Sequence, residues 1–147
     1  MPIPSPIIDH IRALFATRPL LAVLGATPRP HRAAHYVSAY LQHNGATILP
    51  VNPKYTGAVI LGSPCVATVT EATQSLPSGR RLDAVVVFRT SEAVPGHLDD
   101  ILHAAPHRVW LQLGIRHDPT ARRLEQRGIQ VVQDRCLKVD HARVFGF

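Results

Sequence analysis

The stretch that decides the fold is Leu20-Leu21-Ala22-Val23-Leu24-Gly25-Ala26-Thr27. An unbroken apolar run that ends at a glycine is typical of a strand buried on both faces, as in a parallel sheet. Ala34, Val37 and Leu41 then recur at helical spacing. A second apolar run, Ala46 to Val51, follows that helix. This strand–helix–strand order predicts the first half of a nucleotide-binding α/β domain.

The rest of the chain continues the alternation. Short apolar runs that read as strands stand at Ala84–Phe88, Arg108–Leu113 and Ile129–Val132, and helical stripes separate them. Strict alternation predicts a Rossmann-like, doubly wound, mostly parallel five-stranded sheet with helices on both faces. Right-handed crossovers then favour the strand order 3-2-1-4-5, counted along the chain. Ser5 and Pro6 have the pattern of an N-cap and first helical residue, which predicts an extra N-terminal helix.

Composition bounds the class of protein. A chain of 147 residues with 46% hydrophobic and 18% charged residues fits one globular domain, with the helix in residues 1–18 and a core over 20–141. No apolar run approaches the ~20 residues of a membrane span, and residues 1–6 lack a signal-peptide pattern. We therefore expect a cytoplasmic protein with no membrane partner. Two cysteines make no disulfide framework.

The charge favours an anionic partner. The net charge is +6, which suits nucleic acid or a polyphosphate ligand. Aromatic residues are only 5% of the chain and leave few platforms on which bases could stack. This scarcity counts against a basic nucleic-acid-binding module, which is kept as an alternative.

The turn after the first strand has the features of a phosphate site. Gly25 permits a sharp turn, and the helix that begins near Ala33 presents free N–H groups and a positive dipole end. Thr27 adds a hydroxyl, while Arg29, His31 and Arg32 add positive charge. The G-x-G-x-x-G fingerprint of dinucleotide sites is absent. An ordinary strand-to-helix turn is the competing interpretation.

The end of the second strand narrows the choice of nucleotide. An NAD site needs an acidic residue there for the ribose hydroxyl. This chain has Asn52-Pro53-Lys54 instead, and its next carboxylate is Glu71. Lys54 would attract a phosphate on the ribose, which leaves NADP or coenzyme A. A solvated loop lysine is the alternative, and an NADP-linked oxidoreductase remains open as a function.

Five ordered motifs resemble one family. They are Gly25-Ala26-Thr27, residues 50–55, Val87-Phe88-Arg89, residues 110–116 and Asp134-Arg135-Cys136-Leu137-Lys138. Together they resemble the small stand-alone CoA-binding proteins, a family similar to the CoA-binding domain of the succinyl-CoA synthetase alpha subunit. The resemblance covers roughly Leu20 to His141, and it implies binding of coenzyme A or an acyl-CoA.

The resemblance also implies a set of ligand-binding residues. Positions 25–27 and 32 would contact the pyrophosphate, 52–54 the adenosine and its phosphate, 88–89 a channel, and 112–114 the pantetheine. These residues are Gly25, Ala26, Thr27, Arg32, Asn52, Pro53, Lys54, Phe88, Arg89, Gln112, Leu113 and Gly114. Ala34 departs from the family, which often has serine there.

The sequence offers no catalytic or metal centre. The histidines show no H-E-x-x-H pattern, and no Cys-x-x-Cys pair occurs. Cys136 has cationic neighbours that would favour a thiolate, which could form a mixed disulfide with CoA by exchange with an existing disulfide, although a small buried residue is the alternative. We therefore expect binding of CoA or acyl-CoA without catalysis. A protein partner or a homo-oligomer is left open.

Overall fold

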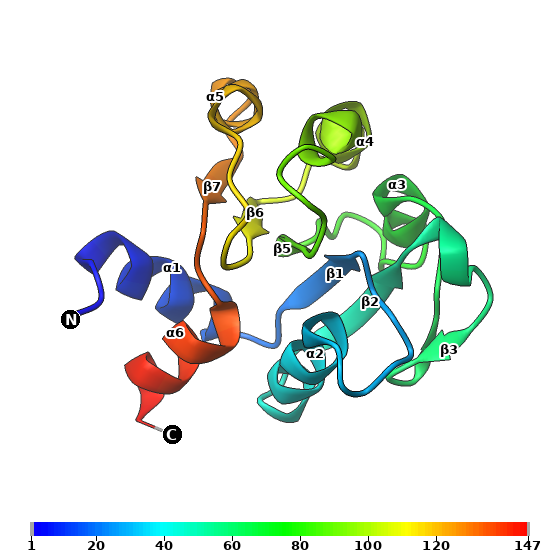
Figure 1. Ribbon diagram of the computed structural model, residues 1–147, viewed down its shortest axis with the longest axis horizontal. Coiled ribbons are helices and arrows are strands. Elements are labelled where there is room, and N and C mark those ends of the chain that lie inside the picture. The colour runs from blue at the N-terminus through cyan, green and yellow to red at the C-terminus, as the bar shows by residue number, and fades with distance from the viewer. Residues whose placement is uncertain (1, 147) are drawn as a thin grey trace.

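The computed structural model describes residues 2–146, and a five-stranded parallel sheet forms its centre. Its strands lie in the order β2-β1-β5-β6-β7 (Figure 1). They are β1 (Leu20–Leu24), β2 (Thr47–Val51), β5 (Ala84–Val87), β6 (Arg108–Leu111) and β7 (Gln130–Val132). A separate antiparallel hairpin, β3 (Val59–Ile60) and β4 (Ser63–Pro64), was not anticipated by the sequence.

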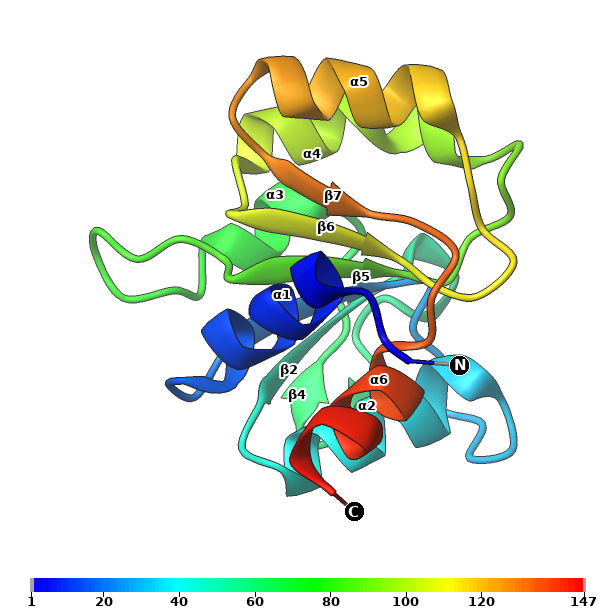
Figure 2. The same ribbon diagram turned by 90° about the vertical axis from the view of Figure 1, so that its left-hand side faces the viewer.

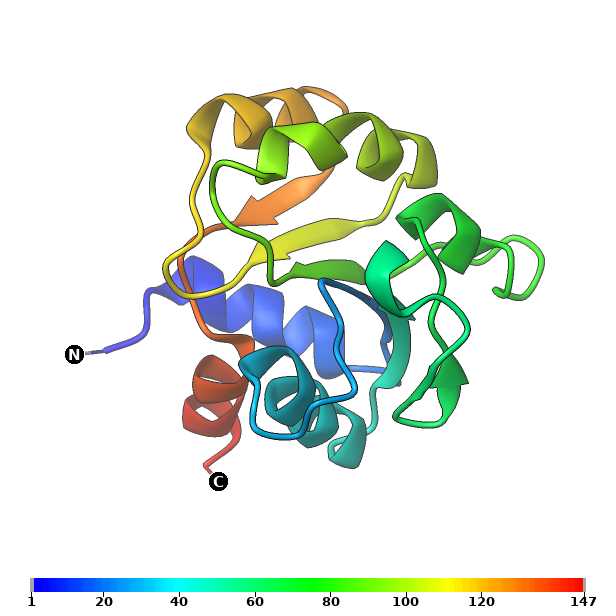
Figure 3. The same ribbon diagram turned by 45° about the vertical axis from the view of Figure 1, so that its right-hand side comes forward.

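Helices cover both faces of the sheet, as Figures 2 and 3 show. One layer contains α1 (Ser5–Phe15), α2 (Ala33–His43) and α6 (Leu137–Phe145). The opposite layer contains α3 (Val69–Thr73), α4 (Leu98–Ala104) and α5 (Asp118–Gln126). The short 3-10 helices are η1 (Pro53–Tyr55) and η2 (Val94–His97). The predicted Rossmann-like α/β architecture with an added N-terminal helix is confirmed.

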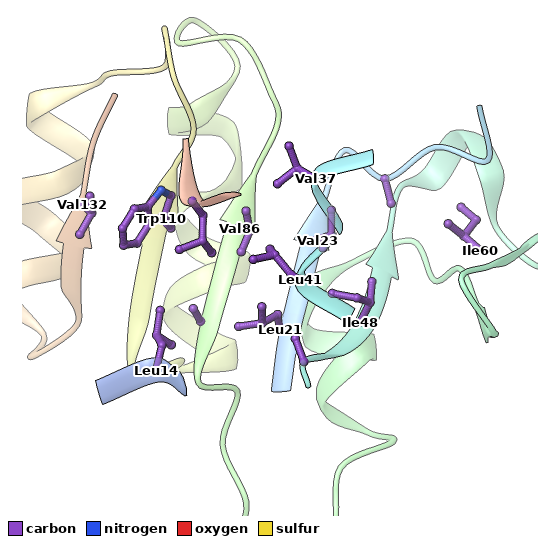
Figure 4. Packing of buried hydrophobic residues seen from close by; sticks show 14 of the residues in the cluster. Leu14, Leu21, Val23, Val37, Leu41, Ile48, Ile60, Val86, Trp110 and Val132 are labelled. Atoms are coloured by element: carbon purple, nitrogen blue, oxygen red, sulfur yellow. The ribbon is translucent and has the colours of Figure 1, made fainter. Parts of the chain in front are cut away.

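The alternation of side chains along β1 explains the two cores. Leu21 and Val23 point into the layer of α1, α2 and α6 and belong to the cluster that also contains Val86 and Trp110 (Figure 4). Ala22 and Leu24 point the other way and join the core beneath α3, α4 and α5. Because successive residues of a strand face opposite sides, an unbroken apolar run feeds both cores.

The predicted strand order is wrong. Counted along the chain, the five strands lie in the order 2-1-3-4-5, with β5 beside β1 rather than beside β2. The place beyond β2 is taken by Val66, which makes a single parallel bridge with Val51. The Val66 N–H donates to the Pro50 carbonyl (3.1 Å), and its carbonyl accepts from Asn52 (2.9 Å). A single bridge does not require a run of apolar residues, so the sequence around Val66 gives no sign of a strand.

The start of the first helix also differs from the prediction. The helix begins at Ser5, Pro4 is its N-cap, and no side chain caps it. Ile11 and Leu14 are its buried residues, and they hold the helix against the sheet. No helix among residues 2–146 is both long and apolar enough to cross a membrane.

Candidate functional site

A hollow of about 520 Å³ opens where the carboxyl ends of β1, β2 and β5 meet. In open α/β sheets, ligands bind beyond the carboxyl ends of the strands. The residues around the hollow come from the loop after β1, the start of α2, the loop after β2 and the end of β5. They are Gly25, Thr27, Arg29, His31, Arg32, Ala33, Ala34, Asn52, Lys54, Tyr55, Phe88 and Arg89.

Gly25 allows two strand ends to come together. Its φ is +93°, and a Cβ built there would lie 2.9 Å from the Phe88 carbonyl oxygen. Its N–H donates to the Val51 carbonyl (2.9 Å), while the Phe88 N–H donates to the Leu24 carbonyl (2.8 Å). Any side chain at Gly25 would push Phe88 away, so glycine sets the floor of the hollow.

Asn52 joins the loops that follow β1 and β2. Its side-chain amide donates to the Ala26 carbonyl (3.0 Å), and its side-chain oxygen accepts from the Lys54 N–H (3.0 Å). The second bond caps η1 and positions Lys54 at the rim. Asn52 lines the hollow, but both ends of its amide are engaged in holding the loops.

The charged side chains that line the hollow are all positive. Arg29, Arg32, Lys54 and Arg89 line it, and none of its lining residues is acidic. The first residues of α2, Ala33 and Ala34, line it as well. No side chain caps α2, so free N–H groups and the positive end of the helix dipole lie at the hollow. This arrangement suits a ligand with several negative charges.

Tyr55 spans from η1 to the loop after β1. A hydrogen bond with Thr27 lowers the pKa of the Tyr55 hydroxyl, and the charges of Lys54 and Arg29 lower it further against an opposing effect of burial. The Lys54 ammonium lies 5.5 Å from the centre of the Tyr55 ring. Thr27, 8% exposed, also accepts from the Arg29 N–H (3.3 Å).

Seven of the predicted site residues gather around this hollow: Gly25, Thr27, Arg32, Asn52, Lys54, Phe88 and Arg89. Ala26 is buried (1% exposed) and is not among the lining residues. Pro53 is exposed and is not among the lining residues. Arg29, His31 and Tyr55 also line the hollow but are not among the predicted site residues. The sequence analysis names the charges of Arg29 and His31, and the position of Tyr55 directly after Asn52-Pro53-Lys54 was the signal that could have identified it.

The predicted residues 112–114 lie elsewhere. Gln112 is buried, and its side chain accepts from the Leu137 N–H (3.0 Å) at the start of α6. The Gly114 N–H donates to Asp134 (2.6 Å). Leu113 lines a second hollow, of about 210 Å³, together with Asp134, Arg135, Cys136, Val139, Asp140 and Arg143. The sequence could not show that Gln112 and Gly114 have structural partners, because each partner is about 20 residues or more away along the chain.

Within residues 2–146, no group of three or more histidine, cysteine, aspartate or glutamate side chains is placed to hold a metal ion. Cys65 is buried, and Cys136 is partly exposed. Neither cysteine lines the larger hollow.

Comparison with known proteins shows the family to which this chain belongs. The family model described as "CoA binding domain" matches residues 20–142. The uncharacterized protein YneT of Bacillus subtilis is 33% identical over 138 residues, which cover 94% of this chain and 96% of YneT.

Solved structures of similar proteins share this fold. A Thermus thermophilus protein, cell-free ID.343, is 40% identical with a TM-score of 0.84, over 94% of this chain and 98% of that one. A hypothetical protein from Pyrococcus horikoshii OT3 is 26% identical with a TM-score of 0.82, over 99% of this chain and all (100%) of the other. The dinucleotide-forming acetyl-coenzyme A synthetase 1 of Ca. Korarchaeum cryptofilum, 21% identical over 85% of this chain and 27% of its own, shares the fold (TM-score 0.65).

Proposed function

Because this chain belongs to the CoA-binding domain family, we propose that its larger hollow binds coenzyme A or an acyl-CoA. The observation that carries the proposal is the charge of the lining: Arg29, Arg32, Lys54 and Arg89 with no carboxylate among them. Coenzyme A contains a pyrophosphate and a ribose phosphate, so a site for its nucleotide half needs cations near each of these two groups. An acidic residue for an NAD ribose is absent from the same lining.

The two phosphate groups have different places in this proposal. The pyrophosphate lies over the loop after β1, where the uncapped start of α2 and Arg32 attract it. The ribose phosphate lies by Lys54, which η1 holds at the rim through Asn52. Phe88 and Arg89 line the side from which the uncharged arm leaves.

The proposal is for binding without turnover. Tyr55 and Thr27 are hydrogen-bonded to each other. His31 is the only histidine that lines the hollow, and no cysteine or carboxylate lines it to act together with His31. A binding protein of this kind would hold or deliver the coenzyme in the cytoplasm.

Isothermal titration calorimetry with CoA tests the proposal. Arg32→Ala removes a cation from the hollow, and a charged hydrogen bond contributes about 1.5–3 kcal/mol, so CoA binding is expected to weaken at least about tenfold. Arg122→Ala is the matched control, because Arg122 is an exposed arginine on α5 outside the hollow. Equal affinities for the two variants would contradict the placement of the phosphates.

A further inference from the structure

A third hollow, of about 310 Å³, lies between α1 and α6. The two helices lie side by side, as Figures 1 and 2 show. The lining residues come from the segment before α1, from α1 itself and from the last turn of α6. They are Pro2, Ile3, Ile8, Arg12, Arg143 and Val144. None of them lines the larger hollow, so the third hollow is separate from the proposed coenzyme site.

The two isoleucines of this hollow belong to neither core. On α1, Ile11 and Leu14 are buried against the sheet. Ile8 is half-buried, and neither Ile8 nor Ile3 is among the residues of the described chain that form the two cores or pack against them. Both line the third hollow together with Val144. The helix α1 therefore has a second apolar face, which does not hold it to the sheet and can contact an apolar ligand.

The charged residues of the third hollow are both arginines. Arg12 is four residues after Ile8 on α1, so the two side chains lie on the same face of the helix, one turn apart. Arg143 comes from α6. Both arginines are exposed, and no acidic residue lines the hollow. Within residues 2–146, the Arg12 side chain makes no hydrogen bond and no ion pair. The lining therefore combines apolar side chains with an excess of positive charge.

The size of the hollow and its mixture of side chains indicate a class of ligand. Small-molecule sites are mostly apolar with a few polar groups, and about 300 Å³ is the lower end of their range. From Ser5, the first residue of α1, to Arg12 the helix rises about 10 Å. An extended chain of about eight carbons has a similar length, since a C–C bond is about 1.5 Å long. A small amphiphile with one negative charge therefore fits both the charge and the length.

We propose that the third hollow binds a medium-chain carboxylate, an acid of about six to ten carbons. The carboxylate lies between Arg12 and Arg143, where charge-assisted hydrogen bonds from the guanidinium groups stabilise it. The alkyl chain lies along Ile8 toward Ile3 and removes their apolar surface from water. The inference does not rest on the proposed function, because the larger hollow and the third hollow share no lining residue.

Titration of the isotope-labelled protein with sodium octanoate, followed by NMR, tests the inference. The amide signals of Ile8, Arg12 and Val144 are expected to shift and to saturate, while those of Gly25 and Lys54 in the larger hollow stay in place. Hexanoate is expected to bind more weakly, by about twofold for each methylene removed, because an open hollow covers only part of each methylene. Octanol has the same tail without the charge, and its binding is expected to be about fivefold weaker than that of octanoate.

Substitutions in the third hollow give an independent measurement. Arg12→Gln is expected to weaken octanoate binding about three- to fivefold, the contribution of an exposed ion pair. Arg18→Gln is the matched control, because Arg18 is an exposed arginine that follows α1 and lines none of the three hollows. Ile3→Ser removes part of the apolar wall outside the helices, and it is expected to weaken binding about twofold. The amide signals of the central sheet are expected to stay in place in all three variants, which shows that the fold is intact.

Each of four results would overturn the inference. Octanoate could cause no saturable shift at Ile8, Arg12 or Val144. Shifts confined to Gly25 and Lys54 would place the acid in the larger hollow. Equal octanoate affinities of Arg12→Gln and Arg18→Gln would remove the charge from the site. Sedimentation of the protein with phosphatidylglycerol vesicles, together with no saturable octanoate shift, would assign this face to a lipid surface. Calorimetry with CoA is a separate measurement, so a failure of the proposed function leaves this inference standing, and the reverse is also true.

Discussion

Gly25→Ala tests how closely β1 and β5 must approach to form the floor of the cationic hollow. The added methyl group would lie 2.9 Å from the Phe88 carbonyl oxygen and 3.2 Å from its carbonyl carbon, at a φ of +93°. A left-handed backbone costs a residue with a side chain about 1–2 kcal/mol. The overlap with Phe88 adds about 1–3 kcal/mol, because both strand ends are held by neighbouring strands. The expected total is about 2–5 kcal/mol.

Gly45→Ala separates the two contributions. Gly45 has a similar φ of +104°, but no atom lies within 4 Å of a Cβ built there. Its replacement is expected to cost only the backbone term, about 1–2 kcal/mol. Urea unfolding of both variants measures the difference, with a slope that should stay unchanged. Equal losses of stability in the two variants would refute the close approach of Gly25 to Phe88.

Three further predictions concern charge and burial. Lys54→Ala is expected to weaken CoA more than dephospho-CoA in calorimetric titrations, and equal losses would remove Lys54 from the ribose phosphate. Arg135→Ala leaves the buried Asp140 without its arginine partner and is expected to lower the free energy of unfolding in urea by about 2 kcal/mol. This is less than the loss for a fully buried pair, because Arg135 is 27% exposed. An unchanged free energy of unfolding would mean that water replaces the guanidinium. Burial lowers the pKa of His141 below 6.5, so the unfolded chain takes up the proton first and stability is lost as pH falls through 6.5. A smaller loss on acidification is expected for His141→Phe, and an identical loss would assign the effect to other groups.

The apolar runs of the sequence were sufficient to predict the layers. Leu20–Leu24 and Ala84–Val87 are almost entirely buried, and only strands covered on both faces require such runs. The strand order needed information that no apolar run carries. A single bridge at Val66 fills the edge position beyond β2, and its neighbours Pro64 and Thr68 give it the appearance of a loop.

The cationic hollow was predictable because its residues follow strand ends, whose positions the sequence marks. The role of Gln112 was not, since its side chain bonds to Leu137 at the start of α6, which only the folded chain brings near. The same holds for Val139, which lies on α6 and lines the second hollow together with Leu113 from the loop after β6.

Calorimetric and thermal titration with CoA, set against NADP, tests the central claim most directly. One CoA is expected to bind per chain and to raise the free energy of unfolding by about 2.7 kcal/mol at a hundred times its Kd, whereas NADP gives no comparable gain. Stabilisation by NADP with no heat and no thermal shift from CoA would contradict the account.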